Sequence, residues 1–326
     1  MKLAIIGLGR MGMALALHAL EDGFDVVAYN RNPEKVKMLV THNFEIQTST
    51  IGTLTPAYSV KEVIHTLPAP RTILLMVPAS AKDQTGSLAL SPVDEVIQQL
   101  LGEGLSAGDT VIDGGNSFYK DSIRRYNELK EKGIHFLDMG TSGGIEGARK
   151  GACLTIGGDK EVFEKIEPLF KALAIPHGYG YVGPAGAGHF VKVTHNGVEY
   201  GMLQAIGEGF AVLEKGPYKL DFHQIAKIWN HGSVIRGWLM ELAERAFQKD
   251  PKLESIEGVV GGGETGRWTV DVANEEGVTV PVLEASLKAR QDSQKMPTFA
   301  GKVIAALRNE FGQHETKKKS SHTTSP

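Results

Sequence analysis

The chain has 326 residues, of which 41% are hydrophobic and 22% are charged, and its formal net charge is −3. This length allows two domains with well-buried cores, and the balance is typical of a water-soluble globular protein. A slightly acidic chain has no global field that attracts nucleic acid or an anionic membrane, so we expect neither as a partner. The single cysteine, Cys153, excludes an intrachain disulfide framework.

Membrane and export signals are missing from the sequence. No apolar run approaches the roughly 20 residues of a membrane helix. The N-terminus shows no signal-peptide cleavage pattern and runs straight into an apolar segment. We therefore expect a cytoplasmic protein.

Residues 1–178 alternate short apolar runs with helix-length segments. The predicted strands are Leu3–Ile6, Val26–Tyr29, Thr72–Met76, Thr110–Ile112 and His135–Asp138. The helical segments between them include Gly12–Leu20, Val93–Leu101 and Ser122–Lys132, and residues 83–91 are predicted as a loop. This alternation predicts an α/β, Rossmann-like domain with a doubly wound parallel sheet.

The pattern changes near residue 181, and residues 179–312 are predicted to form an all-helical substrate and oligomerisation domain. Residues 185–214 form a long stretch of helical character without proline. Further helical segments are His223–Ile228, Val234–Gln248 and Pro281–Ser293. The tail, residues 313–326, is rich in Lys, Ser and Thr and is predicted to be disordered.

The first candidate site is the hexamer Gly7-Leu8-Gly9-Arg10-Met11-Gly12, which lies between an apolar strand and an apolar helix. In such a motif the first glycine permits a tight turn and the second lets the backbone approach a pyrophosphate. The third glycine lets the helix pack on the strand. The amide groups and dipole of the helix N-terminus favour phosphate. A dinucleotide site is therefore predicted here, with a plain glycine turn as the alternative.

The second predicted strand ends in Asn30-Arg31. A carboxylate at this place holds the ribose 2′-hydroxyl of NAD and would repel the 2′-phosphate of NADP. Asn30 is neutral, and the Arg31 guanidinium can pair with that phosphate. We therefore predict NADP as cofactor. If Arg31 is only a surface cation, NAD is possible as well.

The segment that follows residue 188 carries an unusual stripe of polar side chains. Counted from Lys192, the residues His195, Asn196, Glu199 and Tyr200 fall three, four, seven and eight positions later. On a helix of about 3.6 residues per turn these positions share one face. The stripe could supply a base, an acid and hydrogen-bonding groups, or it could be a salt-bridged face in solvent.

Two glycine-rich segments follow predicted strands, where doubly wound folds place their ligand loops. These segments are Asp113-Gly114-Gly115-Asn116-Ser117 and Ser142-Gly143-Gly144. Glycines allow close backbone approach and leave amides for an anion. Each segment taken alone could also be a plain turn.

Together these motifs resemble the 6-phosphogluconate dehydrogenase family, within the wider β-hydroxyacid dehydrogenases. The resemblance runs in order over most of the chain. It rests on Gly7–Gly12, Asn30-Arg31, Asp113–Ser117, Ser142–Gly144, Gly188–Gly201, Gly266-Arg267-Trp268-Thr269 and Ala289-Arg290.

The resemblance implies that the protein oxidises and decarboxylates 6-phosphogluconate to ribulose 5-phosphate, as in the pentose phosphate pathway and gluconate utilisation. By this resemblance Lys192 is the general base and Glu199 the acid that protonates the enediol. It also implies a cofactor contact at Val77, in the loop that follows Met76, and no metal. The residues implied to bind substrate are Asn116, Ser142, Gly143, Gly144, His195, Asn196, Tyr200, Arg267 and Arg290, with Asn116 also near the nicotinamide.

The sequence departs from the long form of that family in ways that affect the phosphate site. The long form has a second helical repeat, and its tail supplies an arginine and a histidine to a neighbouring subunit. This chain resembles the short form, and Arg267 stands where the long form has lysine. We expect a homo-oligomer, a dimer or tetramer, in which intertwined subunits complete the substrate domain.

Two other functions are weighed against this one. A β-hydroxyacid dehydrogenase for an unphosphorylated acid, such as 3-hydroxyisobutyrate, would share the glycine motifs and Lys192. It would have less use for His195, Glu199, Tyr200, Arg267 and Arg290. A non-catalytic NADP-binding regulator would be expected to lack the base or the acid, and both are present.

Overall fold

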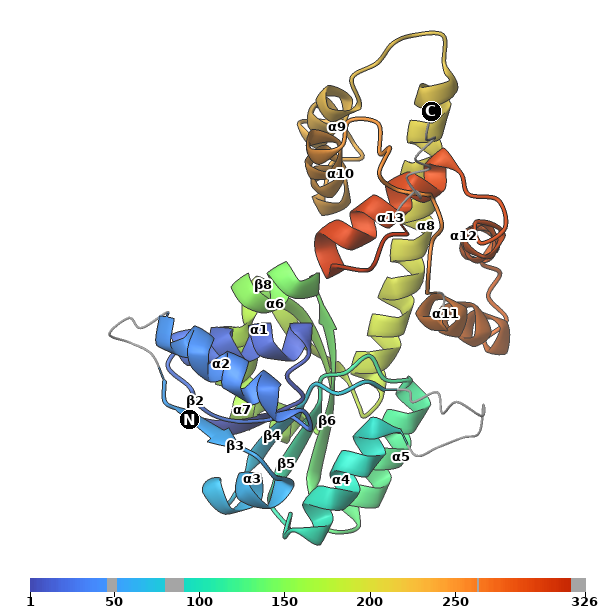
Figure 1. Cartoon of the computed structure of the whole chain (residues 1–326). Coiled ribbons are helices and arrows are strands. Elements are labelled where there is room, and N and C mark those ends of the chain that lie inside the picture. The colour runs from blue at the N-terminus through green and yellow to red at the C-terminus, as the bar shows by residue number, and fades with distance from the viewer. Residues whose placement is uncertain (46–51, 80–90, 263, 318–326) are drawn as a thin grey trace. The chain divides into compact units, whose positions relative to one another are not determined.

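The structure is a computed structural model that describes residues 1–45, 52–79, 91–262 and 264–317. It divides into two compact units, Met1–Lys192 and Val193–Pro326, which Figure 1 shows in blue to green and in yellow to red. The boundary predicted after residue 178 falls inside strand β8 (Ala174–Gly183). The first unit extends further because this strand completes its sheet.

The first unit is built on an eight-stranded sheet in the order β3-β2-β1-β4-β5-β6-β7-β8. All neighbouring pairs are parallel except β6 and β7, which are antiparallel. The strand order reverses between β1 and β4, and open α/β sheets bind ligands at that point, beyond the carboxyl ends of the strands. The strands are β1 (Lys2–Ile6), β2 (Asp25–Tyr29), β3 (Leu54–Ala57), β4 (Thr72–Leu75), β5 (Thr110–Asp113), β6 (His135–Ser142), β7 (Ala152–Gly158) and β8.

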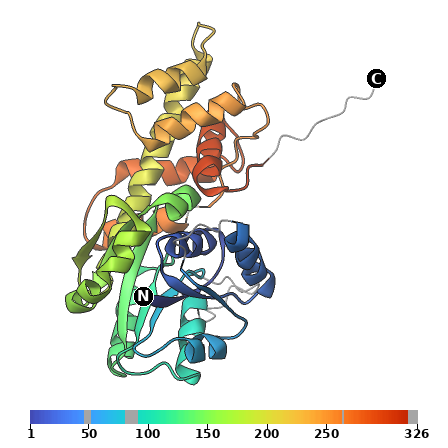
Figure 2. The same cartoon turned by 90° about the vertical axis from the view of Figure 1, so that its left-hand side faces the viewer.

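Helices cover both faces of this sheet, which confirms the doubly wound prediction (Figures 1 and 2). One face is packed by α1 (Arg10–Glu21), α2 (Pro33–Glu45), α6 (Gly144–Lys150) and α7 (Lys160–Leu173). The other face is packed by α3 (Val60–Thr66), α4 (Pro92–Gly102) and α5 (Tyr119–Lys130). Strands covered on both faces are buried throughout and mostly apolar, as β4 is, because neither side of the pleat meets water.

The sequence did not reveal three of the strands. β8 contains a proline and three glycines, which weaken any alternating pattern, and such residues are tolerated at the edge of a sheet. β7 ends in two glycines, and β3 has a proline among only four residues. Each of these strands can be identified from its pairing with a neighbouring strand, but not from its own composition.

The described part of the second unit is helical, as predicted. Helix α8 (Ala187–Lys215) begins in the first unit and continues into the second. Phe210, Phe222 and Phe247 pack against one another in the centre of the helical core, with ring centroids 4.7 to 6.0 Å apart. The other helices are α9 (Phe222–Asn230), α10 (Trp238–Lys249), α11 (Glu264–Glu275), α12 (Pro281–Asp292) and α13 (Phe299–Gly312).

The predicted tail and the predicted loop at residues 83–91 are only partly covered by the described residues. Residues 313–317 are described, and the amide of Glu257 donates to the carbonyl of Lys317 at 2.9 Å, so this part of the predicted tail is held. The rest of the tail and residues 83–90 of the predicted loop lie outside the described residues.

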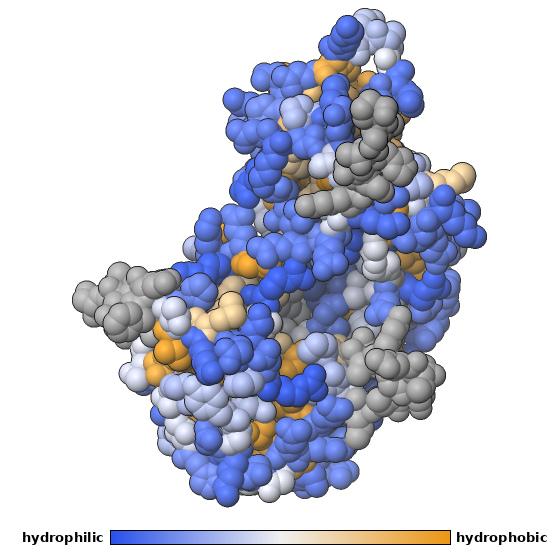
Figure 3. Space-filling model, viewed as in Figure 1, coloured by the Kyte–Doolittle hydropathy of each residue, from blue (hydrophilic) through white to orange (hydrophobic). Residues whose placement is uncertain are grey.

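Hydrophilic residues dominate the face drawn in Figure 3, with apolar ones scattered among them. Among the described helices, none is long and apolar enough to span a membrane.

Candidate active site

The glycine hexamer forms the turn between β1 and α1, and each of its three glycines is required for a different reason. Gly7 has a φ of +100°, and a Cβ there would lie 2.6 Å from the carbonyl oxygen of Met76. A Cβ on Gly12 would lie 1.9 Å from the carbonyl oxygen of Gly7. A Cβ on Gly9 would meet nothing within 4 Å of it. Two glycines are thus fixed by packing, and Gly9 keeps a space clear beside the first turn of α1.

The residues around this turn hold its shape. Asn30 accepts a hydrogen bond from the amide of Leu8 at 2.9 Å and donates to the carbonyl of Asn32 at 3.0 Å. Asn30 therefore joins the glycine turn to the end of β2, a role that the sequence did not indicate. Arg31 is exposed at the same strand end, as are Gly9 and Arg10. Cγ1 of Val77 lies 2.9 Å from the position of a Cβ on Gly7, so Val77 borders the turn.

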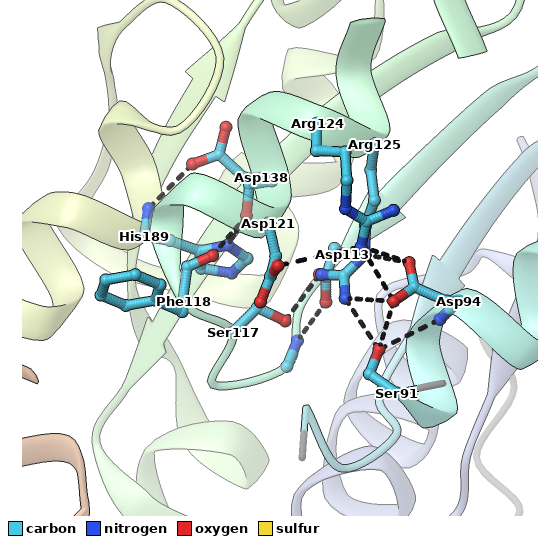
Figure 4. Close-up of polar contacts among 12 residues, drawn as sticks. Ser91, Asp94, Asp113, Ser117, Phe118, Asp121, Arg124, Arg125, Asp138 and His189 are labelled. Carbon is cyan, nitrogen blue, oxygen red and sulfur yellow. Dashed lines mark hydrogen bonds and ion pairs between the residues drawn. The ribbon is translucent and has the colours of Figure 1, made fainter. Parts of the chain in front are cut away.

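The Asp113–Ser117 segment follows β5, and its aspartate shapes the loop from within. One carboxylate oxygen of Asp113 accepts from the amide of Gly115 at 3.1 Å, and the other accepts from Oγ of Ser117 at 2.7 Å. Asn116 lies between these anchored residues and is exposed. The loop therefore presents Asn116 at the carboxyl end of β5, beside the bond between Asp113 and Ser117 that Figure 4 draws.

A buried cation supports this loop from α5. Arg125 donates to Asp113 at 3.2 Å, to both carboxylate oxygens of Asp94 at 2.7 and 3.1 Å, and to Oγ of Ser91 at 2.8 Å. Burial raises the pKa of Asp94, but hydrogen bonds and attraction from Arg125, with further bonds from Arg124 and Ser91, lower that pKa to about 2. Figure 4 shows these groups converging on Asp94.

Lys192 and Ser142 meet at the end of β6. The Lys192 ammonium donates to Oγ of Ser142 at 2.8 Å, and Ser142 is the last residue of the strand. Gly143 and Gly144 follow with φ values of +112° and +61°, and α6 begins at Gly144. These left-handed conformations favour glycine, so the segment needs its glycines for the sharp strand-to-helix turn. The structure thus brings together the predicted base and the predicted Ser-Gly-Gly loop.

The rest of the polar stripe belongs to the second unit and lies on α8. Nδ1 of His195 lies 3.4 Å from the side-chain oxygen of Asn196. His195 is exposed, Asn196 is buried, and Glu199 and Tyr200 are half-buried. By helix geometry these residues continue the face that begins at Lys192.

Tyr200 packs against the buried guanidinium of Arg290, and the half-buried Arg308 lies close to that arginine. The guanidinium carbon of Arg290, on α12, lies 3.7 Å from the centre of the Tyr200 ring. Nη2 of Arg308, on α13, and Nη1 of Arg290 lie 3.0 and 3.9 Å from the position that a Cβ on Gly262 would occupy. The two arginines therefore flank one point of the helical unit. Arg308 was not among the residues predicted from the sequence, although a cation that follows the apolar run Val303–Leu307 was a signal.

Burial dominates the electrostatics of this pair. It lowers the pKa of Arg290, and attraction to Tyr200 and Glu199 only partly opposes it. Burial also lowers the pKa of Arg308, and repulsion from Arg290 lowers it further. Nη1 of Arg290 is buried and has no hydrogen-bond partner among the described residues. Such an arrangement is suited to an anion, because a buried cation without a partner is costly.

Helix α11 holds the other predicted phosphate residue. A Cβ on Gly266 would lie 2.4 Å from the ring of Tyr200, so this glycine lets the tyrosine pack on α11. Thr269 donates to the carbonyl of Val193 at 2.6 Å and joins α11 to α8. Arg267, between them, is exposed. The Gly266–Thr269 motif therefore contributes mainly packing around Tyr200, and Arg267 contributes an exposed cation.

The residues present fit a dinucleotide. The space at Gly9 is clear, and in the described part of the chain no side chain caps the N-terminus of α1 at this residue. Both features match a backbone cradle for a pyrophosphate. Over the described ranges, which omit residues 46–51, 80–90, 263 and 318–326, we find no cluster of three or more His, Cys, Asp or Glu that could hold a metal ion.

Comparisons with known protein families match nearly the whole chain. Residues 2–183 match the NAD binding domain of 6-phosphogluconate dehydrogenase, and residues 188–323 match the C-terminal domain of 6-phosphogluconate dehydrogenase.

Three relatives illustrate the similarity. YqeC of Bacillus subtilis (strain 168), provisionally named a 6-phosphogluconate dehydrogenase, is 47% identical over 319 residues, covering 98% of this chain and 100% of that protein. An NAD(+)-dependent, decarboxylating 6-phosphogluconate dehydrogenase of Haloferax volcanii is 39% identical, and the match covers 98% of this chain and 99% of that protein. An NADP(+)-dependent, decarboxylating enzyme of Bacillus subtilis is 37% identical over 89% of this chain. The chain spans only 60% of that longer protein.

Solved structures give the same grouping. A 6-phosphogluconate dehydrogenase of Plasmodium falciparum, studied with NADP+ and with 6-phosphogluconate, superposes with a TM-score of 0.78 at 32% identity. That match covers 90% of this chain and 62% of the other. A 3-hydroxyisobutyrate dehydrogenase of Mycobacterium tuberculosis has a TM-score of 0.68 at 19% identity over 94% and 99% of the two chains, which shows a shared fold.

Proposed function

Because the chain belongs to the 6-phosphogluconate dehydrogenase family, we propose that it oxidises and decarboxylates 6-phosphogluconate to ribulose 5-phosphate and carbon dioxide. The observation that carries the proposal is the contact between Lys192 and Ser142. This contact places an amine beside two left-handed glycines at the carboxyl end of the sheet, where such folds bind their ligands.

In the first step Lys192 acts as general base. When bound, the nicotinamide dinucleotide accepts a hydride from C3 of the substrate. The Lys192 amine takes the proton of the 3-hydroxyl, and C3 becomes a ketone. Oγ of Ser142, 2.8 Å from the Lys192 nitrogen, holds the amine in place for this transfer.

In the second step the ketone accepts the electron pair that the departing carboxylate leaves behind. Protonated Lys192 returns its proton to the ketone oxygen, which gives an enediol. Glu199 lies seven residues later, about two helical turns along α8. It donates a proton to the carbon that lost carbon dioxide, which becomes C1 of ribulose 5-phosphate. Lys192 takes the proton back from the neighbouring enediol oxygen, which restores the ketone at C2.

The substrate phosphate is proposed to bind beside Tyr200, Arg290 and Arg308. A phosphate carries nearly two negative charges at neutral pH, and guanidinium groups donate paired hydrogen bonds to it. The unpartnered Nη1 of Arg290 supports this assignment. Arg267, which is exposed, is also proposed to contact the phosphate. His195 and Asn196 are proposed to bind substrate hydroxyls, and Asn116, Ser142, Gly143 and Gly144 to contact the reacting end.

The cofactor is a nicotinamide dinucleotide held by the turn from Gly7 to Gly12, with Leu8, Arg10, Met11, Asn30 and Val77 around it. We propose a preference for NADP. Arg31 is exposed and available to a 2′-phosphate, whereas Asn30 is occupied by the turn. The relatives named above include both NAD(+)-dependent and NADP(+)-dependent enzymes.

Self-association is also proposed. Large apolar side chains of the second unit are exposed in the single chain, including Val212, Val234 and Val282 at 72%, 102% and 66%. Such residues are covered in many oligomers. The count of subunits stays a prediction.

The experiment is an initial-rate assay of nicotinamide reduction with 6-phosphogluconate and either NADP or NAD. We expect turnover with release of one carbon dioxide per reduced cofactor, and a higher kcat/KM with NADP. Lys192→Met should abolish turnover, by at least about 1,000-fold, while cofactor binding is retained.

Other outcomes would reassign the protein. Turnover with 3-hydroxyisobutyrate but not 6-phosphogluconate would place it with the dehydrogenases of unphosphorylated acids. Tight NADP binding without turnover of any sugar acid would favour a regulator. A kcat/KM that is equal for both cofactors would remove the proposed role of Arg31.

A further inference from the structure

Strand β6 presents one face to the beginning of helix α8, and that face carries three residues with different tasks. Side chains two positions apart on a strand point to the same side. Asp138, Gly140 and Ser142 therefore form one row. On the antiparallel neighbour β7 the residues opposite them are Gly157, Thr155 and Cys153.

Asp138 caps the helix from outside. The carbonyl of Gly186 accepts from the amide of Phe190, so Gly186 stands at the N-cap position, where a side chain would ordinarily accept from the first free amides. Glycine has no such side chain. Asp138 is fully buried, and its two carboxylate oxygens accept from the amides of Gly186 and His189 at 2.7 and 2.8 Å. Figure 4 shows the bond to His189. A carboxylate at this end also suits the helix dipole.

Gly140 and Thr155 set the distance between the strands and the helix. A Cβ on Gly140 would lie 2.5 Å from Cβ of Lys192 and 2.9 Å from the carbonyl oxygen of Gly188. Oγ1 of Thr155 donates to that same carbonyl at 3.0 Å. The first turns of α8 are therefore in close contact with the sheet, and the Lys192 stem passes directly over Gly140.

Ser142 completes the row by accepting from the Lys192 ammonium at 2.8 Å. We propose that Asp138 is a positioning residue for the general base. By fixing the rotation and height of α8 against β6, it holds the Lys192 nitrogen at Ser142 and thus at the substrate hydroxyl. This inference rests on the proposed function of Lys192.

The test compares two buried aspartates. Asp138→Asn keeps the shape but replaces one acceptor oxygen by an amide NH2 group, a donor that faces a backbone N–H donor. Asp109 is also fully buried and accepts from two backbone amides, those of Arg71 and Ser106, at 2.7 and 3.0 Å, and from the Arg71 guanidinium at 2.9 Å. It lies just before β5, at the amino end of the strand, so Asp109→Asn is a matched control for lost stability alone.

We expect Asp138→Asn to lower kcat by about 10- to 100-fold, because a displacement of about 1 Å of a catalytic group can cost that much. The Kd for the cofactor, measured by fluorescence titration, should change less than twofold. With substrate deuterated at C3, the isotope effect on kcat should rise, because a misplaced base slows the chemical step. Asp109→Asn should lower the Tm by a similar amount without changing kcat or the isotope effect.

Thr155→Val provides a milder variant in case Asp138→Asn does not fold. It removes only the bond to Gly188 and should lower kcat about threefold to tenfold with the same rise in the isotope effect. Equal kcat losses in the Asp138 and Asp109 variants, or a normal isotope effect in both Asp138→Asn and Thr155→Val, would overturn the positioning role. Undiminished turnover by Lys192→Met would instead refute the proposed function, so the two failures are distinguishable.

Discussion

Each unit of the protein buries an arginine, and the two are treated in opposite ways. Arg125 in the first unit is 1% exposed, and two carboxylates and a hydroxyl accept its hydrogen bonds. Arg290 in the second unit is 6% exposed. It stacks on Tyr200, its neighbour Arg308 is a second cation, and its Nη1 has no hydrogen-bond partner among the described residues.

The difference separates a structural cation from one that is available to a ligand. Arg125 is satisfied within the fold, where it joins the Asp113 loop to the start of α4. Attraction to Tyr200 and Glu199 only partly offsets the cost of burying Arg290, and a substrate phosphate has the charge and acceptors to compensate the rest. Burial alone therefore does not indicate function, whereas a buried donor without an acceptor points to a ligand.

The largest expected effect tests this comparison directly. Arg290→Met should raise the KM for 6-phosphogluconate about 100-fold, because it removes charge-assisted hydrogen bonds of about 1.5–3 kcal/mol each. Its Tm should stay equal or rise, because an unpaired buried charge is lost. Arg308→Met should act in the same direction. Both changes are measured by steady-state kinetics and thermal unfolding, with the KM for cofactor as the internal control.

Arg125→Met is the opposite arm of the comparison. It leaves the buried Asp113 without its cation and leaves Asp94 with Arg124 alone, and the free energy of unfolding should fall by about 3 kcal/mol. A stable Arg125 variant together with an unfolded Arg290 variant would reverse the assignment of the two arginines. Added 6-phosphogluconate should raise the Tm of the wild type but not of Arg290→Met.

The sequence was sufficient where the signal is local. The turn at Gly7–Gly12, the Gly143–Gly144 turn and the long helix α8 follow from glycine spacing and helical periodicity, and the structure has them where they were predicted. Each of these features depends on residues that are close neighbours along the chain.

The sequence was insufficient where the partners are distant along the chain. Asp138 was placed at the end of a predicted strand, yet β6 continues to Ser142 and Asp138 caps a helix that begins about fifty residues later. Arg308 is significant only because α13 and α12 bring it beside Arg290. Tertiary packing creates both roles, and no spacing rule encodes them.

In the first unit the proposed anion site is the cofactor pyrophosphate site at the Gly7–Gly12 turn, which does not use a buried cation. Its cradle is backbone, so Gly9→Ala should leave the fold intact and raise the Kd for the cofactor about tenfold, since the new Cβ fills space that is clear of protein. Gly12→Ala should instead lower the Tm, because its Cβ would lie 1.9 Å from a carbonyl oxygen. Fluorescence titration and thermal unfolding measure the two effects. A Gly9 variant with unchanged cofactor affinity would contradict the cradle.

The smallest expected effect concerns the counter-charge of Arg125. The pKa of Asp94 is lowered from 3.8 to about 2 in the folded protein, so its carboxylate stabilises the fold fully above about pH 4. That contribution is lost as the pH falls from about 4 to about 2. Since the carboxylate is partly solvated, we expect it to be worth about 1 kcal/mol. Urea unfolding of wild type and Asp94→Asn should differ by this amount at pH 6 and converge near pH 2.

Asp292→Asn is the matched control, because Asp292 pairs with Lys288 on the exposed side of α12. That variant should differ from wild type by less than about 0.5 kcal/mol at either pH, since exposed ion pairs contribute little. A gap between wild type and Asp94→Asn that persists at pH 2 would mean that Asp94 stabilises by packing rather than by charge. The charge of Asp94 would then not compensate Arg125, and the proposed difference between Arg125 and Arg290 would not hold.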